Sequence, residues 1–278
     1  MKTTLHRRDV VETLLKDRKD LLVVAGLGST AWDISAAGDT PLNFPLWGAM
    51  GNAAMFGLGL ALAQPRRRVL VLTGDGERAF CVGADMKNPS MRGVDYWAAS
   101  RPGGFGGIAL RDTLNIPVIA RVNGYALGGG FEMVLGCDIV VACDEASFGL
   151  PEPLVGRLPL DGGMTLLQRQ IPHRIAMGML LTGQRIKAQR ALEIGLVNEV
   201  VPRAELDAAV ARWVAQILAC APLSVQAIKQ VVRATAAMSP VQAQALRLPA
   251  LVAALQSEDA DEGVKAFQQK RKPVWKGR

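Results

Sequence analysis

Residues 117–133 read PVIARVNGYALGGGFEM, and this stretch determines how we interpret the rest of the chain. The β-branched run Val118–Val122 predicts a buried strand, and Asn123-Gly124 predicts a turn. Three glycines, Gly128 to Gly130, then precede a run without breakers that can open a helix. Glycines let a ligand approach the backbone closely, and the first N–H groups of a helix have no partners within it. The stretch therefore predicts a strand–turn–helix unit that can hold an anion or a developing oxyanion.

Glu132 falls in the first turn of that predicted helix, beside whatever the free N–H groups hold. One interpretation makes it a catalytic carboxylate. The other makes it a structural residue whose charge complements the helix dipole. A single glycine-rich turn is a weak signal and leaves both interpretations open.

Two further stretches extend the pattern: residues 78–87, RAFCVGADMK, and residues 147–156, SFGLPEPLVG. Together the three stretches resemble the crotonase (enoyl-CoA hydratase/isomerase) superfamily, and the resemblance runs from about Thr73 to Arg278. Residues 257–278 resemble in particular the branch that dehydrates carnitinyl-CoA, which is also the branch that hydrates crotonobetainyl-CoA. The resemblance implies an α/β fold, a crotonase-type ββα spiral followed by a C-terminal helical region that forms oligomers.

The resemblance also implies roles for particular residues. Glu132 and Glu152 match the paired catalytic glutamates, of which Glu132 activates the water and Glu152 protonates the α-carbon. The backbone N–H groups of Ala84 and Gly129 match the oxyanion hole. The residues implied in binding the substrate and its CoA part are Asp85, Lys87, Phe267 and Lys270, the last two of which reach a neighbouring subunit's CoA in the family.

Structural alternatives remain beside these roles. Glu152 is alternatively a surface loop residue, although Pro151 and Pro153 stiffen its backbone. Asp85 either tunes the oxyanion loop or caps a helix, and Lys270 alternatively complements a helix dipole. The chain also departs from the family pattern. Asp161 stands where hydratases usually have a small residue, and Arg121 occupies an apolar strand position, where a buried charge would need a partner.

The opening segment resembles a different family. Residues 24–28, 48–51 and 74–76 resemble the pyrophosphate-binding domain of thiamine-diphosphate enzymes, near the sulfopyruvate and phosphonopyruvate decarboxylases. In that family the Asp of Gly-Asp-Gly ligates a metal ion together with a later Asn. Here no Asn lies between Asn88 and Asn115, so we expect no metal site at Asp75 and no thiamine diphosphate. We predict three parts: a thiamine-enzyme-like segment (1–76), a spiral core (77–203) and a helical region (204–278).

Periodicity and breakers predict the remaining elements. Strands are expected over 21–26, 69–73, 117–122, 138–143 and 198–201; helices over 8–20, 48–64 and 174–181, and from Gly130; loops over 27–47 and 148–165, with a flap over 88–107. Three or four amphipathic helices follow residue 203. The last of them is expected to run from Glu258 to Lys272 and to end at Pro273.

Composition narrows the possible partners and the compartment. The chain has 278 residues and a net charge of +7, which suits an anionic partner such as nucleic acid or a phosphate-bearing ligand like CoA. Only 5% of the residues are aromatic, too few for a stacking surface that binds single strands. The four cysteines have no metal-like spacing, and the N-terminus does not resemble a signal peptide. We expect a cytoplasmic protein without a membrane span.

These observations predict a hydro-lyase that adds water to, or removes it from, a 2-enoyl-CoA thioester in fatty acid or carnitine metabolism. We expect a homotrimer or hexamer with no metal and no cofactor, since CoA is part of the substrate. Three other interpretations compete with this one: an enoyl-CoA isomerase, a fragment of a thiamine-diphosphate-dependent decarboxylase, and a non-catalytic nucleic-acid-binding or scaffold protein.

Overall fold

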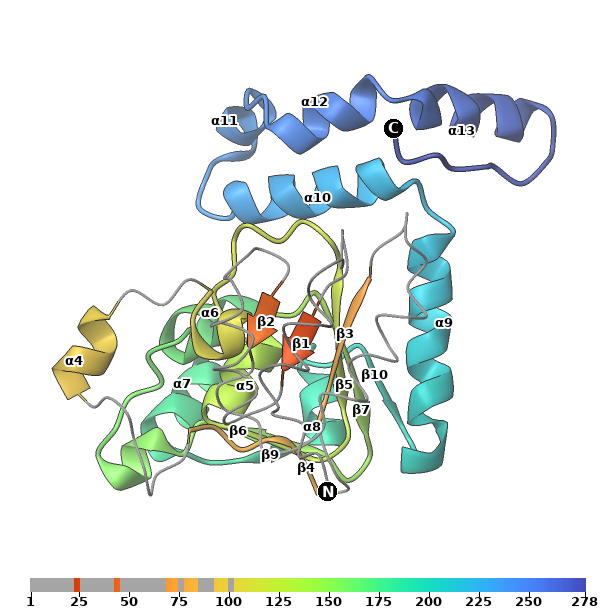
Figure 1. Ribbon diagram of the computed structural model, residues 1–278. Helices are drawn as coiled ribbons and strands as arrows, with labels where there is room; N and C mark the ends of the chain where they lie inside the picture. The colour runs from red at the N-terminus through yellow and green to blue at the C-terminus, as the bar shows by residue number, and fades with distance from the viewer. Residues whose placement is uncertain (1–22, 26–42, 46–68, 75–77, 85–92, 100–102) are drawn as a thin grey trace, which may run out of the picture.

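The computed structural model describes residues 23–25, 43–45, 69–74, 78–84, 93–99 and 103–278 (Figure 1). The helices expected over 8–20 and 48–64 lie outside the described residues. The expected strand 21–26 is confirmed as β1 (Val23–Ala25), which pairs in parallel with β2 (Asn43–Pro45). The second of these strands falls in a segment expected to be a loop.

Two four-stranded sheets form the core. The first contains β3 (Leu70–Thr73), β5 (Val118–Val122), β7 (Ile139–Cys143) and β10 (Glu199–Val201), all parallel, in the order β10-β7-β5-β3. The second contains β4 (Ala79–Cys81), β6 (Tyr125–Leu127), β8 (Ser147–Gly149) and β9 (Ile186–Lys187), with only β9 antiparallel to its neighbour. Because β3 pairs with β5, the expected strand 69–73 is part of the core.

The chain visits the two sheets in turn, which makes the fold a ββα spiral as predicted. Strand β5 lies in the first sheet, β6 in the second, and α5 (Gly129–Leu135) follows. The next turn repeats the order with β7, β8 and then helical segments. Asn123-Gly124 forms the corner between β5 and β6, so the turn predicted there is confirmed.

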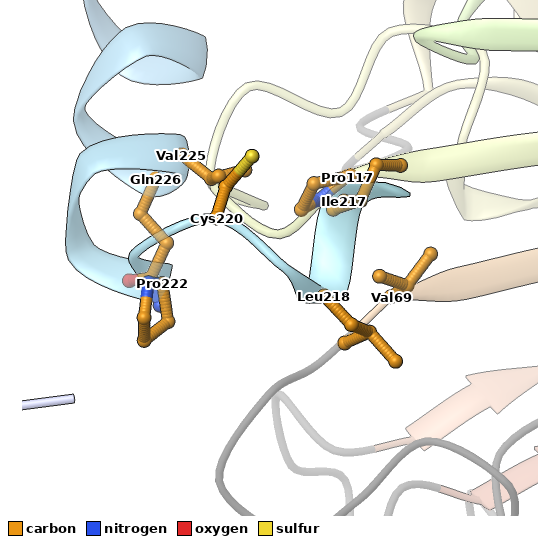
Figure 2. Close-up of a pocket in the computed structure, with 8 residues that line it drawn as sticks. All are labelled: Val69, Pro117, Ile217, Leu218, Cys220, Pro222, Val225 and Gln226. Atoms are coloured by element: carbon orange, nitrogen blue, oxygen red, sulfur yellow. The ribbon is translucent and has the colours of Figure 1, made fainter. Parts of the chain in front are cut away.

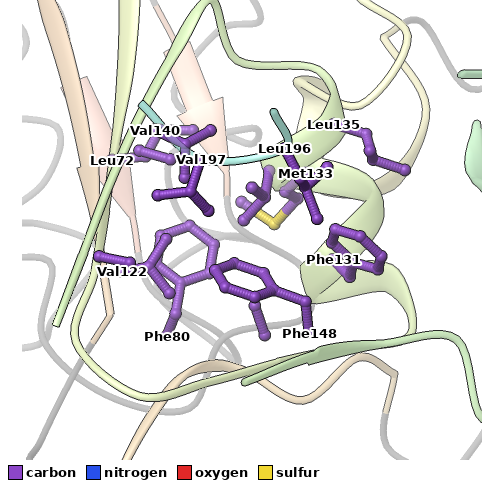
Figure 3. Packing of buried hydrophobic residues seen from close by; sticks show 14 of the residues in the cluster. Leu72, Phe80, Val122, Phe131, Met133, Leu135, Val140, Phe148, Leu196 and Val197 are labelled. Carbon is purple, nitrogen blue, oxygen red and sulfur yellow. The ribbon is translucent and has the colours of Figure 1, made fainter. Parts of the chain in front are cut away.

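Side chains from both sheets and from α5 fill the space between them (Figure 3). The rings of Phe131 and Phe148 are fully buried, with their centroids 5.7 Å apart. Ile119 is also fully buried, as expected of a central parallel strand that is covered on both faces. This packing fixes the start of α5 relative to the ends of the neighbouring strands.

Helices follow each turn of the spiral and then form a C-terminal region. They are α6 (Gly163–Gln170), α7 (His173–Thr182), α8 (Ala188–Glu193), α9 (Leu206–Leu218), α10 (Pro222–Ala234), α11 (Pro240–Gln244), α12 (Pro249–Leu255) and α13 (Glu258–Gln268). Figure 1 shows α9 running beside the first sheet and α10 crossing the top of the core, with α11–α13 lying beyond α10. In the described part of the chain, no single helix is long and apolar enough to cross a membrane. Residues 203–218 and 222–234 reach the required length and apolar composition only when they are taken as a pair, and the two segments are bent by 101° relative to each other.

Several expected loops contain short elements. The flap over 88–107 contains α4 (Gly93–Ala98) and the 3-10 turn η1 (Phe105–Gly107). The loop over 148–165 contains the end of β8, the 3-10 turn η2 (Glu152–Val155) and the start of α6. Strands and turns of three or four residues show less than two full periods, so their pattern is not visible in the sequence.

The last helix ends earlier than predicted. Helix α13 stops at Gln268, and Lys270 follows in a left-handed conformation with φ 54°. Lys270 is therefore not the last-turn cation that the dipole interpretation required. Arg271 instead pairs with Glu262 at 2.6 Å, and the Glu262 carboxylate also accepts the N–H of Val274. These contacts fold the C-terminal segment back along the helix.

Arg121 lies on strand β5, and its charged side chain forms an ion pair. Its Nε lies 2.6 Å from Asp207 Oδ1 on α9, and its Nη1 donates to Thr73 Oγ1 on the neighbouring strand. The side chain is 18% exposed. The pair therefore ties α9 to the edge of the first sheet.

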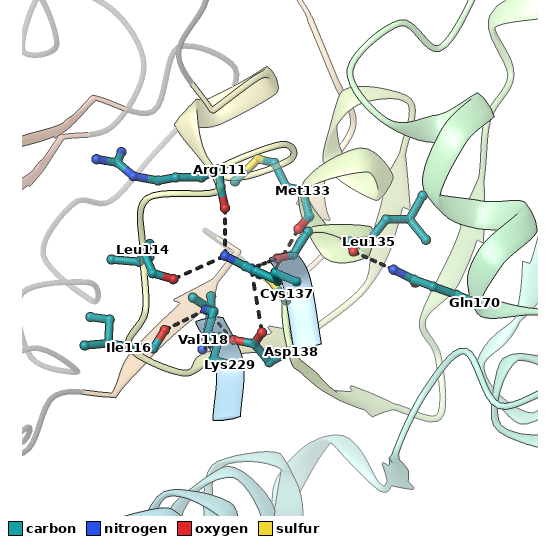
Figure 4. Close-up of polar contacts among 12 residues, drawn as sticks. Arg111, Leu114, Ile116, Val118, Met133, Leu135, Cys137, Asp138, Gln170 and Lys229 are labelled. Atoms are coloured by element: carbon teal, nitrogen blue, oxygen red, sulfur yellow. Dashed lines mark hydrogen bonds and ion pairs between the residues drawn. The ribbon is translucent and has the colours of Figure 1, made fainter. Parts of the chain in front are cut away.

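A second, more buried charge joins α10 to the core (Figure 4). The Nζ of Lys229 donates to Asp138 Oδ2 and to the carbonyl of Ile116, both at 2.6 Å, and only 7% of its side chain is exposed. Asp138 Oδ2 also accepts the N–H of Val118, at the start of β5. Burial lowers the pKa of Lys229, and the charge of Asp138 opposes that shift.

Lys229→Met is therefore expected to lower the free energy of unfolding by about 3 kcal/mol, because it removes the nearest cation from Asp138 and leaves that carboxylate with the more distant Arg233, at 3.6 Å. Chemical denaturation of the variant measures the loss. The matched control is Arg190→Met on α8, whose pair with Glu193 is half exposed and is expected to contribute less than about 1 kcal/mol. Equal losses in the two variants would contradict this account of α10.

Candidate active site

The end of β4 packs tightly against the start of α5, and glycine makes that contact possible. A Cβ placed on Gly130 would lie 2.0 Å from the carbonyl oxygen of Cys81, so no larger residue fits there. A Cβ placed on Gly83 would lie 3.2 Å from the backbone nitrogen of Gly129. The loop that carries Ala84 therefore touches the N-terminus of α5.

This contact brings together the two segments predicted to form the oxyanion hole. Gly129 is the first residue of α5, so its N–H has no acceptor within the helix. The N-cap residue is Gly128, which has no side chain that could accept a hydrogen bond from these N–H groups. Ala84 directly follows Gly83 and is exposed. The arrangement can present two backbone N–H groups to one oxygen atom.

Glu132 lies on the first turn of α5 and is only 3% exposed. Its Oε1 accepts the N–H of Asp161 at 2.7 Å and the N–H of Gly163 at 2.9 Å. Burial raises the pKa of Glu132 to about 8, and the charges of Asp161 and Glu152 act in the same direction. The two N–H donors oppose that rise. The carboxyl group is thus fixed in place and retains a proton at neutral pH.

Glu152 begins η2, on the loop that faces the start of α5. A Cβ placed on Gly128 would lie 3.0 Å from Glu152 Oε1. Among the described residues, no group donates to Glu152 Oε2, although this oxygen is buried. Burial also raises the pKa of Glu152. Glu152 is therefore half-buried within its loop, with one carboxylate oxygen shielded from solvent.

The two glutamates form an interacting pair at the oxyanion segments, because the charge of Glu152 contributes to the pKa shift of Glu132. Carboxyl groups that share a dry site titrate as a unit and hold one proton between them over a range of pH. One member can then act as an acid while the other acts as a base. The site is chemically suited to moving protons next to a stabilised oxyanion.

Of the other four predicted substrate-binding residues, the structure describes two, and both lie away from the glutamates. Asp85 and Lys87 fall outside the described residues. Phe267 is 86% exposed on α13, and Lys270 follows the end of that helix. Figure 1 places α13 beyond α10, away from α5, so the chain does not bring these two residues to its own glutamates.

Sequence reasoning missed the partners of Glu132. Asp161 was recognised only as a departure from the family pattern, and Tyr96 was not singled out at all. The structure shows that the Tyr96 hydroxyl donates to Asp161 Oδ2, across 65 positions of sequence. A local sequence pattern cannot predict a contact between residues so far apart in the chain.

A small pocket lies away from these residues, at the elbow between α9 and α10 (Figure 2). It is lined by Val69, Pro117, Ile217, Leu218, Cys220, Pro222, Val225 and Gln226. Nearly all of these side chains are apolar, and neither glutamate is among them. We therefore place the candidate active site at the start of α5 and not in this pocket.

Known proteins resemble this chain in sequence and in fold. The family model described as enoyl-CoA hydratase/isomerase matches residues 49–278. The chain is 43% identical to a carnitinyl-CoA dehydratase of Proteus mirabilis (strain HI4320) over 219 residues, covering 77% of this chain and 84% of that relative. It is 41% identical to a carnitinyl-CoA dehydratase of Salmonella typhi over 246 residues, covering 85% and 94%. A solved enoyl-CoA hydratase from Mycobacterium tuberculosis H37Rv has a TM-score of 0.69 and 34% identity, over 83% of this chain and 90% of that one.

The family match begins at residue 49, upstream of the Thr73 start expected from the sequence. Residues 49–72, which we had included in the thiamine-enzyme-like segment, are thus part of the match. The remaining glycine motifs of that likeness, residues 24–28 and 74–76, lie largely outside the described residues. The three-part division of the chain stays a prediction.

Proposed function

The chain belongs to the enoyl-CoA hydratase/isomerase family, and from that premise we propose that it is a hydro-lyase acting on 2-enoyl-CoA thioesters. One observation carries the proposal. A buried oxygen of Glu152 without a described partner lies beside the start of α5, where Glu132 and the N–H of Gly129 also lie. A water molecule and the reacting end of an enoyl thioester supply the partners that these groups need.

In hydration, the Glu132 carboxylate removes a proton from water as the water oxygen bonds to the β-carbon. The π electrons move toward the thioester oxygen, which accepts the N–H groups of Ala84 and Gly129. Each such donor can contribute on the order of 3 kcal/mol of transition-state stabilisation. Glu152 then gives a proton to the α-carbon, and the thioester carbonyl re-forms.

Dehydration runs the same steps backwards. Glu152 removes the α-proton, and protonated Glu132 gives its proton to the leaving hydroxyl. Burial raises the pKa of Glu132 to about 8, so this carboxyl group can hold the proton that leaves with the hydroxyl group. The singly protonated pair reaches the hydration-competent form when that proton moves to Glu152.

Hydration and dehydration both need the pair of Glu132 and Glu152 to hold one proton. This requirement determines how kcat/KM should depend on pH. The ratio of kcat/KM for hydration to kcat/KM for dehydration equals a pH-independent equilibrium constant. Both profiles should therefore be bell-shaped with the same limbs, and the alkaline limb should fall near pH 8, where Glu132 loses its proton. Initial rates measured in both directions from pH 5 to about 10 test this; limbs that differ between directions would contradict the shared-proton mechanism.

We propose an acyl group of the carnitinyl or crotonobetainyl type, by analogy with the two bacterial carnitinyl-CoA dehydratases that the chain resembles. The proposal extends to a cytoplasmic homotrimer or hexamer in carnitine or fatty acid metabolism. The test is loss of the enoyl-thioester absorbance band with crotonyl-CoA and with crotonobetainyl-CoA. A higher kcat/KM for crotonobetainyl-CoA supports the carnitine assignment, and a lower one supports a short-chain fatty acyl substrate.

An isomerase is the second candidate, since the family includes both activities. Isomerisation moves one proton between two carbons and needs no base for water. The pairing of Glu152 with a second, fixed carboxyl group at Glu132 favours water chemistry. Formation of a 3-hydroxyacyl-CoA product, detected by mass spectrometry, separates the two activities.

We also propose that the enzyme needs no cofactor apart from the CoA of its substrate. Asp75 matches the metal-binding Asp of thiamine-diphosphate enzymes and lies outside the described residues. The chain has no Asn at the position expected for the second metal ligand. Thiamine diphosphate with magnesium is therefore expected to leave the Tm unchanged. A rise in Tm at saturating cofactor would overturn this prediction, because a ligand that binds only the native state must stabilise it.

A further inference from the structure

Helix α4 is linked to Glu132 by two successive hydrogen bonds. The Tyr96 hydroxyl donates to Asp161 Oδ2, and the Asp161 N–H donates to Glu132 Oε1 at 2.7 Å. Asp161 is itself only 3% exposed. The side chain of Tyr96 thus contacts the residue that holds the catalytic carboxyl group.

Helix α4 lies on the surface of the part of the chain that the structure describes. It contains six residues, and none of them is buried. Val94 is 75% exposed and Trp97 is 68% exposed, so the apolar side chains of α4 do not pack into the core. A hydrogen bond from the tyrosine to a buried carboxylate thus joins α4 to the loop that carries Asp161.

Asp161 also acts on Glu132 through its charge. Besides its own burial on α5, two charged groups act on Glu132: the carboxylate of Asp161 before α6 and the carboxylate of Glu152 on η2. Both neighbouring carboxylates raise the pKa of Glu132, while the backbone N–H of Asp161 opposes that rise. A change in where the Asp161 side chain points therefore changes the proton affinity of Glu132.

We propose that Tyr96 and Asp161 are positioning residues, through which α4 sets the placement and the proton affinity of Glu132. The inference rests on the proposed role of Glu132 in hydration. Docking of α4 keeps the Asp161 carboxylate beside Glu132, so that the pair of glutamates retains its shared proton at neutral pH. Without this hydrogen bond, the Asp161 carboxylate loses a donor that orients it, and we expect Glu132 to lose its proton more readily.

Asp161→Asn tests the charge, because it keeps the backbone N–H and nearly the same volume. Removing a like charge lowers the pKa of Glu132, so the alkaline limb of kcat/KM should move about one pH unit toward lower pH. Tyr96→Phe should move the limb in the same direction by a smaller amount. The double variant should behave like Asp161→Asn alone, since both changes act through one carboxylate.

Tyr125→Phe is the matched control. Tyr125 is the only other tyrosine of the chain, is 43% exposed and lies on β6. Its substitution removes the same hydroxyl group without touching Asp161. The alkaline limb of this variant should coincide with that of the wild type.

A spectroscopic readout tests the contact without relying on turnover. Because the chain has two tyrosines, ring-carbon NMR of protein labelled at tyrosine gives two sites, and Tyr125→Phe assigns them. The Tyr96 signal should shift in Asp161→Asn, while the Tyr125 signal should not. An unchanged Tyr96 signal would overturn the inference, as would an unshifted alkaline limb in Asp161→Asn or additive effects in the double variant. Absence of enoyl-CoA turnover in the wild type would instead contradict the proposed function, and the NMR result would still decide whether the contact exists.

Discussion

Glu132→Gln is expected to lower the hydration rate of an enoyl-CoA thioester roughly a hundredfold or more, as loss of a positioned general base usually does. The glutamine oxygen can still accept the N–H groups of Asp161 and Gly163, so the local geometry should survive. Its amide cannot remove a proton from water. Steady-state kinetics with crotonyl-CoA measure the effect, and a variant within a few-fold of the wild type would show that Glu132 is not the base.

The same variant carries its own control for folding. The pKa of Glu132 is about 8 in the folded protein, above the ordinary value of 4.5. The proton is therefore bound more tightly in the folded state, and the resulting stability is fully present below pH 4.5 and is lost as the pH rises toward 8. Glutamine does not ionise, so the variant does not lose this stability as the pH rises. Glu132→Gln should therefore have a higher Tm than the wild type at pH 8. Low activity combined with a raised Tm excludes misfolding as the cause.

Glu152→Gln is expected to reduce hydration by a similar factor, for a different reason. Glu152 handles the α-carbon proton, and glutamine can neither give nor take it. The exposed residue Glu193 on α8 provides the matched control, since its side chain is 50% exposed and pairs with Arg190. Glu193→Gln should keep wild-type kinetics. Wild-type hydration by Glu152→Gln would refute the two-glutamate mechanism.

The sequence predicted the backbone geometry at the start of α5. Gly128–Gly130 indicated a close approach before a helix, and the structure shows the carbonyl of Cys81 at the place where a Cβ of Gly130 would lie. Glu132 followed from its position in the first turn. Glu152 followed only from the family resemblance, because nothing in its own neighbourhood distinguishes a buried carboxylate from an exposed one.

What the sequence could not predict depends on contacts over long distances along the chain. The raised pKa of Glu132 reflects burial together with Asp161, about thirty positions away. The link from Tyr96 to Asp161 joins the segment expected to be a flap (88–107) to a loop that follows β8. Strand β6 was missed because three residues, Tyr125–Leu127, show no usable period. Each of these features appears only when the spiral brings the two sheets together.

The most direct test of the two-glutamate account separates the two roles in a single reaction. A saturated thioester such as butyryl-CoA has an α-proton to exchange but no double bond to hydrate, so its exchange in D2O requires the oxyanion hole and the base at Glu152 alone. We expect the wild type and Glu132→Gln to incorporate deuterium at the α-carbon, and Glu152→Gln to lose the exchange. Exchange that persists in Glu152→Gln and disappears in Glu132→Gln would contradict the assignment.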